Sequence, residues 1–303
     1  MTDAMASGPV VVTGANGLVG GRVCAVLAER GVPVRAVVRR AGTAPALPGV
    51  EEVVGEFFDV ELAARVTQGA VGVVTTVHPM GSDRETQHRI GVSGTAVMAR
   101  AARDAGAARL IHVSTAAVYD RSPGAGDVDE SSALVGVDGG DYPETKRDAD
   151  AALAEIDRLT TVLLRPPAIL GAGESSVWNT LRPAAIRDDE SQRHTVPDKS
   201  FAWVHVDDLA AIAADLASGG IADATDPADG PVAGACTAVN VAGGPATDRD
   251  YYETVTAAVG VEPIWDDGPA WTGRILTDRA HRWGWTPQVG LAEALAEIGE
   301  GLR

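Results

Sequence analysis

A tyrosine and a lysine four residues apart form the rarest chemical pattern in this chain. The stretch GDYPETKRDADAAL carries Tyr142 and Lys146, and the whole chain has only four tyrosines and two lysines. A Tyr-x-x-x-Lys spacing would therefore arise by chance roughly 0.03 times. On a helix the two side chains share one face, and a nearby ammonium favours the phenolate. The pair could act as a general acid and base, and the alternative is a surface pair without a role.

A second pattern is a glycine cluster between a strand-like run and a helix-like run. The segment VVVTGANGLVGG begins at Val10, and its Gly-x-x-Gly-x-x-Gly spacing alone would arise by chance roughly 0.5 times. Its placement is more specific, because helix N–H groups and a close backbone approach there can bind a pyrophosphate. The alternative is a plain tight turn. The expected cofactor contacts are Gly14, Asn16, Gly17, Leu18 and Gly20.

The end of the second strand-like run indicates which dinucleotide binds. An acidic residue there would hold a ribose 2′-hydroxyl, whereas arginine accommodates a 2′-phosphate. The sequence VRAVVRR places Val38 at the expected acidic position, followed by Arg39 and Arg40. Guanidinium groups suit a phosphate monoester, so NADP(H) is the favoured cofactor. NAD(H) stays open, because two arginines after a strand can also be merely solvated.

These residues require elements that hold them in place, and strand-like and helix-like segments do alternate through the first half. The expected strands are 10–13, 34–38, 51–54, 71–77, 108–115 and 160–166, and the expected helices are one ending near 30, 63–68, 85–105 and 142–156. Apolar strands separated by helices predict a doubly wound parallel sheet, the α/β Rossmann architecture. We expect a dinucleotide-binding domain over residues 1–170, rejoined by about 204–243. A smaller α/β substrate-binding region would comprise 171–203 and 244–303.

Composition limits the partners and the compartment. A formal net charge of −17 over 303 residues argues against nucleic acid and anionic membranes. No apolar run reaches the ~18 residues of a membrane span, and residues 1–9 lack the features of a signal peptide. Cys24 and Cys236 show no metal-ligand spacing, so we expect no metal site and a reduced, cytoplasmic protein. Five of the six tryptophans lie beyond residue 200, which suggests an apolar or ring-shaped small-molecule substrate, although core packing would also explain them.

Together these motifs resemble those of the short-chain dehydrogenase/reductase superfamily, in its extended, epimerase/dehydratase-like form. TGANGLVG resembles the cofactor loop and YPETK the catalytic pair. HVSTAAVYD, LLRPPAILGAG, VHVDDLA and WGWTP resemble later blocks, so the similarity runs over essentially the whole chain. The resemblance implies an NADP(H)-dependent oxidoreductase. Hydride would pass between the nicotinamide and a ketone or aldehyde, or its alcohol.

By position, the resemblance also implies roles for single residues. Tyr142 would be the general acid/base, and Thr115 would bind the substrate oxygen. Lys146 would bind the nicotinamide ribose and lower the pKa of Tyr142. Asp59 would approach the adenine, and Asp208 would cap a helix. The remaining expected contacts are Val60 and Pro166 with the cofactor, and His78, Ala168 and Trp178 with the substrate; a hydrogen-bonded loop residue is the alternative for His78.

Several positions depart from the family's pattern. Gly91 stands where the family often has asparagine, which weakens the case for a complete catalytic tetrad. Ala168 and Phe201 replace polar groups that bind nucleotide sugars, so such a substrate fits less well. The alternatives are an NAD-dependent sugar-nucleotide epimerase or dehydratase and a non-catalytic dinucleotide sensor. The family commonly pairs the helices expected at 85–105 and 142–156 across a two-fold axis, which implies a homodimer; burial of the same alanine-rich faces within a monomer is the alternative.

Overall fold

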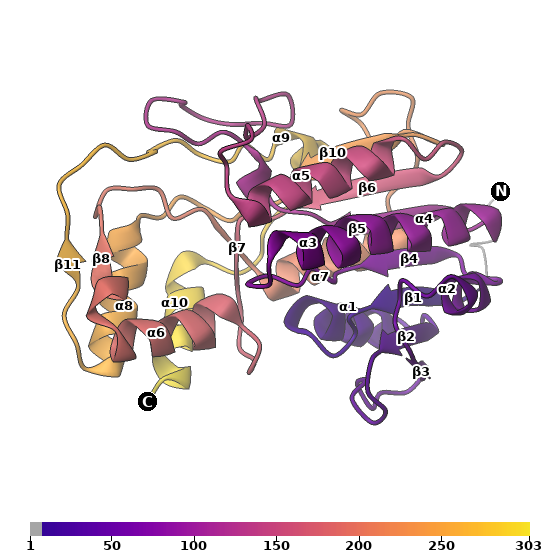
Figure 1. Cartoon of the computed structure of the whole chain (residues 1–303), viewed down its shortest axis with the longest axis horizontal. Coiled ribbons are helices and arrows are strands. Elements are labelled where there is room, and N and C mark those ends of the chain that lie inside the picture. The colour runs from indigo at the N-terminus through magenta and orange to yellow at the C-terminus, as the bar shows by residue number, and fades with distance from the viewer. Residues whose placement is uncertain (1–7) are drawn as a thin grey trace.

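A seven-stranded parallel sheet forms the centre of the computed structural model, which describes residues 8–303 (Figure 1). Its order is β10-β6-β5-β4-β1-β2-β3. The strands are β1 (Val10–Thr13), β2 (Val34–Val38), β3 (Val50–Val54), β4 (Gly72–Thr75), β5 (Arg109–Val113), β6 (Thr160–Arg165) and β10 (Cys236–Asn240). The predicted doubly wound α/β fold is confirmed. The signal-peptide expectation falls on residues 1–9, of which 1–7 lie outside the described part.

Helices cover both faces of this sheet (Figure 1). On one face lie α1 (Leu18–Glu29) and α7 (Val206–Ala217), and on the other α2 (Val60–Thr67), α4 (Thr95–Asp104) and α5 (Asp141–Ala154). Successive strand side chains point to opposite faces, so Val10 and Val12 join the first apolar layer and Val11 the second. The burial of both faces explains why the strands read as continuous apolar runs.

The single helix expected at 85–105 is interrupted in the structure. It consists of α3 (Arg84–Gln87), a wider π-helical turn (His88–Gly94) and then α4. Two glycines in the wide turn pack too closely for a side chain. A Cβ on Gly94 would lie 2.9 Å from Phe58 Cβ, and one on Gly91 would meet the His78 ring. Single π-helical turns inside helices often accompany functional sites.

After β6 the chain builds a smaller lobe beside the sheet, at the left of Figure 1. Its two-stranded sheets pair β7 (Ala168–Leu170) with β9 (Trp203–His205) and β8 (His194–Thr195) with β11 (Ile264–Trp265). Its helices are α6 (Arg182–Asp188), α8 (Asp248–Val259) and α10 (Leu291–Gly301). Ile186, Trp203 and Tyr251 are fully buried in a separate apolar cluster of this lobe. The lobe therefore has a core of its own.

One C-terminal segment returns to the sheet. The helix α9 (Asp278–Arg282) and the residues after it place Trp283 and Trp285 in the apolar layer of α1 and α7. Asp208 secures this segment by accepting the backbone N–H groups of Gln288 and Val289 at 2.9 and 3.1 Å. The expectation that Asp208 caps a helix is thus wrong, because His205 occupies the N-cap of α7.

Within residues 8–303, no helix combines the length and apolar character needed to cross a bilayer.

Candidate functional site

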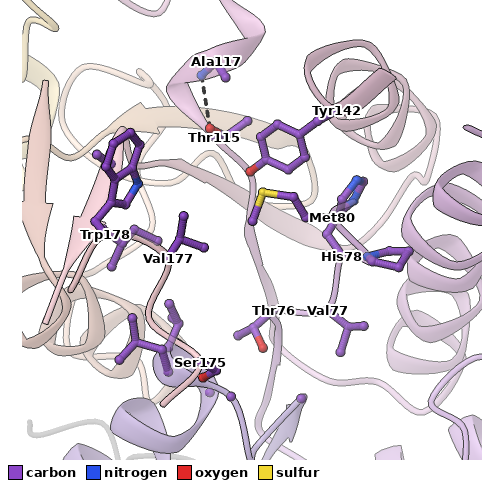
Figure 2. Close-up of a pocket in the computed structure, with 18 of the residues that line it drawn as sticks. Thr76, Val77, His78, Met80, Thr115, Ala117, Tyr142, Ser175, Val177 and Trp178 are labelled. Atoms are coloured by element: carbon purple, nitrogen blue, oxygen red, sulfur yellow. Dashed lines mark hydrogen bonds between the residues drawn. The ribbon is translucent and has the colours of Figure 1, made fainter. Parts of the chain in front are cut away.

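A cavity of about 890 Å³ lies where the sheet meets the smaller lobe (Figure 2). Residues directly after β1, β2, β4 and β5 line it, which places it at the carboxyl ends of the strands. Ligands of open α/β sheets bind at that edge. The smaller lobe closes the other side with Ala168, Trp178 and Phe201. The volume is within the range of small-molecule and cofactor sites.

The glycine loop after β1 forms one end of the cavity. Gly14 has a φ of +66°, which favours glycine, and a Cβ on Gly20 would overlap the Gly14 carbonyl. The helix α1 begins at Leu18, and its N-cap residue Gly17 has no side chain that could cap it, so the first N–H groups of the helix have no such partner. Such N–H groups at a helix N-terminus can bind a phosphate, so the loop fits a dinucleotide pyrophosphate. The cavity wall here includes Gly14, Asn16, Gly17, Leu18 and Gly20.

The structure separates the two arginines that follow β2. Both arginines are exposed, but Val38 and Arg39 line the cavity, whereas Arg40 lies outside its wall. The turn after them is held by Glu52, whose carboxylate accepts N–H groups of residues 42–44 at 2.9–3.0 Å. These hydrogen bonds lower the pKa of Glu52. Of the two arginines, Arg39 is thus the one that reaches the cavity.

Asp59, expected near the adenine, and Val60, expected to contact the cofactor, both lie outside the cavity wall. Asp59 caps α2 by accepting the Leu62 N–H at 2.8 Å, and Val60 is 68% exposed. The cavity wall is built instead by Gly55, Glu56 and Phe57, which directly follow β3. Their position at a strand end is the sequence signal that could have found them. The cap explains the aspartate at this helix start, and the expected cofactor contacts of Asp59 and Val60 stay predictions.

Tyr142 and Thr115 come together in the cavity wall, and Figure 2 shows the phenol oxygen directed toward the Thr115 hydroxyl. Burial raises the pKa of Tyr142, and the Thr115 hydroxyl lowers it. The lowering effect expected of Lys146 stays a prediction, and Thr115 is a second group that acts in the same direction. Thr115 also accepts the Ala117 N–H at 3.1 Å, which orients its hydroxyl.

Lys146 lies one helical turn beyond Tyr142, behind the cavity wall. Its side chain is buried, and Nζ donates a 2.7 Å hydrogen bond to the Val113 carbonyl at the end of β5. Burial lowers the pKa of Lys146 to about 8, while the Asp150 carboxylate raises it. The ammonium therefore keeps its charge at neutral pH but loses it at mildly alkaline pH.

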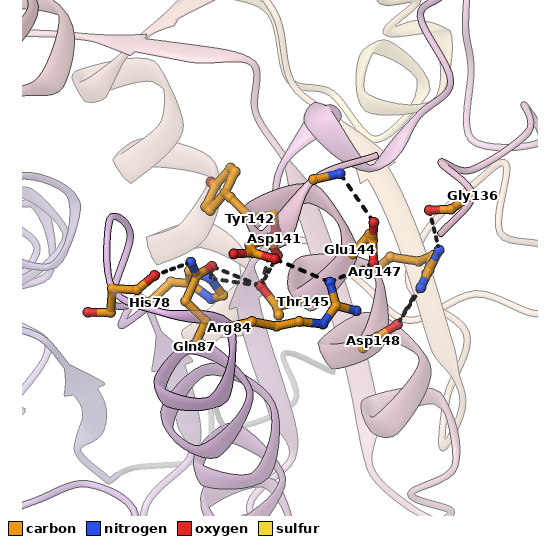
Figure 3. Close-up of polar contacts among 12 residues, drawn as sticks. His78, Arg84, Gln87, Gly136, Asp141, Tyr142, Glu144, Thr145, Arg147 and Asp148 are labelled. Atoms are coloured by element: carbon orange, nitrogen blue, oxygen red, sulfur yellow. Dashed lines mark hydrogen bonds and ion pairs between the residues drawn. The ribbon is translucent and has the colours of Figure 1, made fainter. Parts of the chain in front are cut away.

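His78 lines the cavity and is hydrogen-bonded within its own loop. Its ring packs edge-on against the Tyr142 ring, with 5.2 Å between centroids. Burial and the Lys146 charge lower its pKa to about 4, so the imidazole is neutral. Nε2 lies 3.1 Å from Gln87 Oε1, and the Gln87 amide nitrogen donates to the Ser82 carbonyl (Figure 3). We assign the His78 proton to Nε2, which leaves Nδ1 as an acceptor.

An ion pair fastens the loop of His78 to the helix of Tyr142. Arg84 on α3 lies 2.7 Å from Glu144 of α5 (Figure 3). Thr145, also on α5, donates to Gln87 Oε1 at 3.1 Å. These mostly buried polar contacts connect α3 and the His78 loop to the helix that carries Tyr142.

The substrate side of the cavity is mainly apolar. Ala168 and Trp178 line it as expected, and Trp178 packs edge-on against Phe201 at 5.2 Å. Pro166, whose carbonyl accepts the Ala116 N–H, lies outside the wall, and its neighbour Pro167 lines it. Lining residues that were not expected from the sequence include Met80, Arg121, Lys199 and Trp271. Nothing local marked them, since they come from four separate loops.

In residues 8–303 no group of three or more histidine, cysteine, aspartate or glutamate side chains is arranged to hold a metal ion.

A family model described as NAD(P)H-binding matches residues 14–218. The chain belongs to this family, within the extended short-chain dehydrogenase/reductase superfamily. The description of this family indicates that the cofactor of the protein is a nicotinamide dinucleotide.

Curated relatives of this chain include two named reductases and a named dehydrogenase/isomerase. The 4-hydroxy-2-methyl-3-oxo-4-farnesyl-3,4-dihydroquinoline-1-oxide ketoreductase of Stigmatella aurantiaca is 33% identical over 202 residues, 64% of this chain and 56% of its own. The ceramide reductase of Caulobacter vibrioides is 30% identical over 215 residues, 68% of this chain and 60% of its own. A 3β-hydroxysteroid dehydrogenase/isomerase of Mycobacterium tuberculosis is 27% identical over 192 residues, 59% of this chain and 52% of its own. The chain thus spans little more than half the length of these relatives.

Solved structures share the fold along nearly the whole chain. The UDP-glucose 4-epimerase of Thermotoga maritima superposes with a TM-score of 0.74 at 17% identity, covering 96% of this chain and 97% of that one. The NAD⁺ complex of the Bordetella bronchiseptica enzyme WbmH has a TM-score of 0.74 at 21% identity, covering 96% of each chain. At these identities the likeness concerns the fold alone.

Proposed function

We propose that this protein is an NADP(H)-dependent oxidoreductase that transfers a hydride between the nicotinamide and a ketone or aldehyde, or the corresponding alcohol. The observation that carries the proposal is that Tyr142 and Thr115 line the same cavity as the glycine loop. A cofactor held at that loop and a carbonyl held at Thr115 would therefore share one enclosed space. Relatives named as a ketoreductase and a ceramide reductase support this reaction class.

In the proposed mechanism the bound nicotinamide supplies the hydride when a carbonyl is reduced. The Thr115 hydroxyl donates a hydrogen bond to the carbonyl oxygen and positions it beside the phenol. Tyr142 delivers its proton to that oxygen as negative charge develops, and its raised pKa keeps the proton available until then. The Lys146 ammonium, one turn away on α5, stabilises the phenolate that remains.

The preference for NADP(H) rests on Arg39. Its guanidinium lies at the end of β2, where Val38 leaves no carboxylate to bind a ribose diol. The competing function is an epimerase or dehydratase that retains NAD(H). Ala168 and Phe201 favour the reductase, because they make the cavity wall apolar at positions where the family's nucleotide-sugar enzymes carry polar groups.

The first test is a fluorescence titration of the purified protein with NADPH and NADH, after an assay for nucleotide retained through purification. An empty site and tighter NADPH binding are expected. Retained NAD(H) would instead support the epimerase or dehydratase, and a protein that binds neither cofactor would contradict the proposal.

The second test replaces the phenol. Tyr142→Phe is expected to bind NADPH like the wild type and to lose at least about 100-fold in NADPH oxidation with neutral cyclic or aryl ketones. Tyr252→Phe, in the smaller lobe, is the matched control, because Tyr252 is no part of the cavity wall. Full turnover by Tyr142→Phe would rule out the mechanism.

The homodimer and the cytoplasmic location stay predictions. Sedimentation equilibrium would test the homodimer directly.

A further inference from the structure

Arg121 is an unusual arginine within this acidic protein. It lines the cavity and is partly buried, yet it has no hydrogen bond or ion pair with a protein group in residues 8–303. Every other arginine shielded to this degree in that part of the chain donates at least one such hydrogen bond. Burial lowers the pKa of Arg121, and no carboxylate opposes that effect. Its N–H donors are thus free for a ligand.

The guanidinium is held in place by an aromatic ring and not by a polar partner. Its Cζ lies 5.4 Å from the centroid of the Trp271 ring. Trp271 is itself fixed, since Nε1 donates a 2.7 Å hydrogen bond to the Gly126 carbonyl and its own carbonyl accepts the Ser200 N–H at 3.0 Å. Stacking on a ring face restrains the guanidinium but satisfies none of its five N–H donors.

The charges around the cavity isolate Arg121 further. The charged lining residues are Arg39, Glu56, Arg121, Lys199 and Asp248. Arg39 and Glu56 follow β2 and β3 and belong to the cofactor end. Lys199 and Asp248 compensate each other, with Nζ and Oδ2 3.4 Å apart. On the substrate side this leaves one uncompensated positive charge among apolar walls.

We propose that the substrate carries a carboxylate that Arg121 binds, while its carbonyl or hydroxyl group lies at Thr115 and Tyr142. This inference rests on the proposed function and names its substrate class: an apolar oxo acid or hydroxy acid. A guanidinium fork matches a carboxylate with two parallel hydrogen bonds. A single negative charge balances the single free cation. A phosphate monoester carries nearly two negative charges and would leave one of them unpaired among Phe201, Trp178 and Trp271.

The test compares each keto acid with its uncharged methyl ester. The probes are benzoylformate, 3-benzoylpropionate and 4-benzoylbutyrate, which vary the distance between carbonyl and carboxylate. Binding is measured by calorimetry to protein saturated with NADP⁺, with which a ketone cannot react. Arg121→Gln removes the charge and Arg121→Lys retains it without the fork. Arg65→Gln is the matched control, because Arg65 is exposed on α2 and lies away from the cavity wall.

At least one acid is expected to bind about 10- to 100-fold more tightly than its ester. Arg121→Gln should abolish that preference without weakening ester binding, Arg121→Lys should retain part of it, and Arg65→Gln should leave it unchanged. Thermal unfolding of Arg121→Gln should match the wild type, since no hydrogen bond within the protein is lost. Equal binding of every acid and its ester by the wild type would overturn the proposal. So would a preference that survives in Arg121→Gln.

NADPH oxidation with the neutral esters separates this proposal from the broader one. Turnover of the esters without any preference for the acids would contradict the carboxylate site and still support the proposed oxidoreductase activity. Arg121-dependent acid binding without turnover of any probe would keep the site and contradict the proposed hydride transfer.

Discussion

The imidazole of His78 fills the space that a side chain at position 91 would need. A Cβ on Gly91 would lie 2.5 Å from Nδ1 and 2.7 Å from Cε1 of His78. The same ring packs edge-on against Tyr142. Gly91 and His78 therefore form one packing unit beside the phenol. The glycine at this position, where the resembled family often has asparagine, has a structural reason in this chain.

A double-mutant cycle would measure this packing. Gly91→Ala should lower the free energy of unfolding by about 1–3 kcal/mol, because the added methyl group must displace the ring. In a His78→Ala background the same substitution should cost less, since the space is then open. Urea denaturation of the wild type, the two single variants and the double variant gives the coupling free energy between positions 78 and 91. Gly301→Ala is the control, because that helical glycine has open space around it. Additive losses from the two substitutions would show that they do not share a space.

The low pKa of His78 predicts acid destabilisation. The folded protein holds this pKa at about 4, against 6.5 for an unperturbed histidine. Between these values the unfolded chain binds a proton that the folded site refuses, so stability is lost as the pH falls from 6.5 toward 4. The loss attributable to His78 should reach up to about 3 kcal/mol. His78→Gln should flatten this part of the stability profile in urea denaturation at pH 7 and 5. An unchanged slope would show that another group, such as the buried His112, dominates.

The buried ammonium of Lys146 predicts that the protein becomes more stable at alkaline pH. Its folded pKa of about 8 lies below the ordinary 10.5, so burial of the charge destabilises the protein fully at pH 7. As the pH rises above 8 the folded site releases the proton before the unfolded chain does, and the penalty fades. Lys146→Met should therefore be most stabilising, relative to the wild type, at pH 7. That advantage should shrink by up to about 3 kcal/mol on going to pH 10. A constant difference across this range would contradict the shifted pKa.

The two arginines after β2 should differ in their effect on cofactor choice. Arg39→Ala should weaken NADPH binding by about 10-fold or more and leave NADH binding nearly unchanged, because only NADPH carries the 2′-phosphate. Arg40→Ala is the matched control, since that exposed side chain lies outside the cavity wall. Fluorescence titration gives the dissociation constants of NADPH and NADH for the wild type and for both variants, and these constants test the expectation. Equal effects on NADPH and NADH, or a larger effect from Arg40→Ala, would contradict this assignment.

The parts of this protein that could be predicted from its sequence are those that contiguous residues determine. Apolar runs of strand length predict a buried parallel sheet, and the glycines between β1 and α1 create a phosphate-sized turn within one short segment. Tyr142 and Lys146 share a helix face through their spacing alone. Each of these features depends on local geometry that a few neighbouring residues impose.

Contacts between distant segments depend on the tertiary structure. The Trp271–Gly126 hydrogen bond, which orders the loop beside Arg121, joins residues 145 positions apart. The tertiary structure also decides which of two adjacent residues reaches the cavity, as with Arg39 and Arg40 or Pro167 and Pro166. At the end of a strand, the pleat and the following turn set the direction in which a side chain points. The type of the residue determines neither of them. The guanidinium of Arg121 is free because no carboxylate lies close enough to pair with it. Residue spacing along the chain does not reveal this.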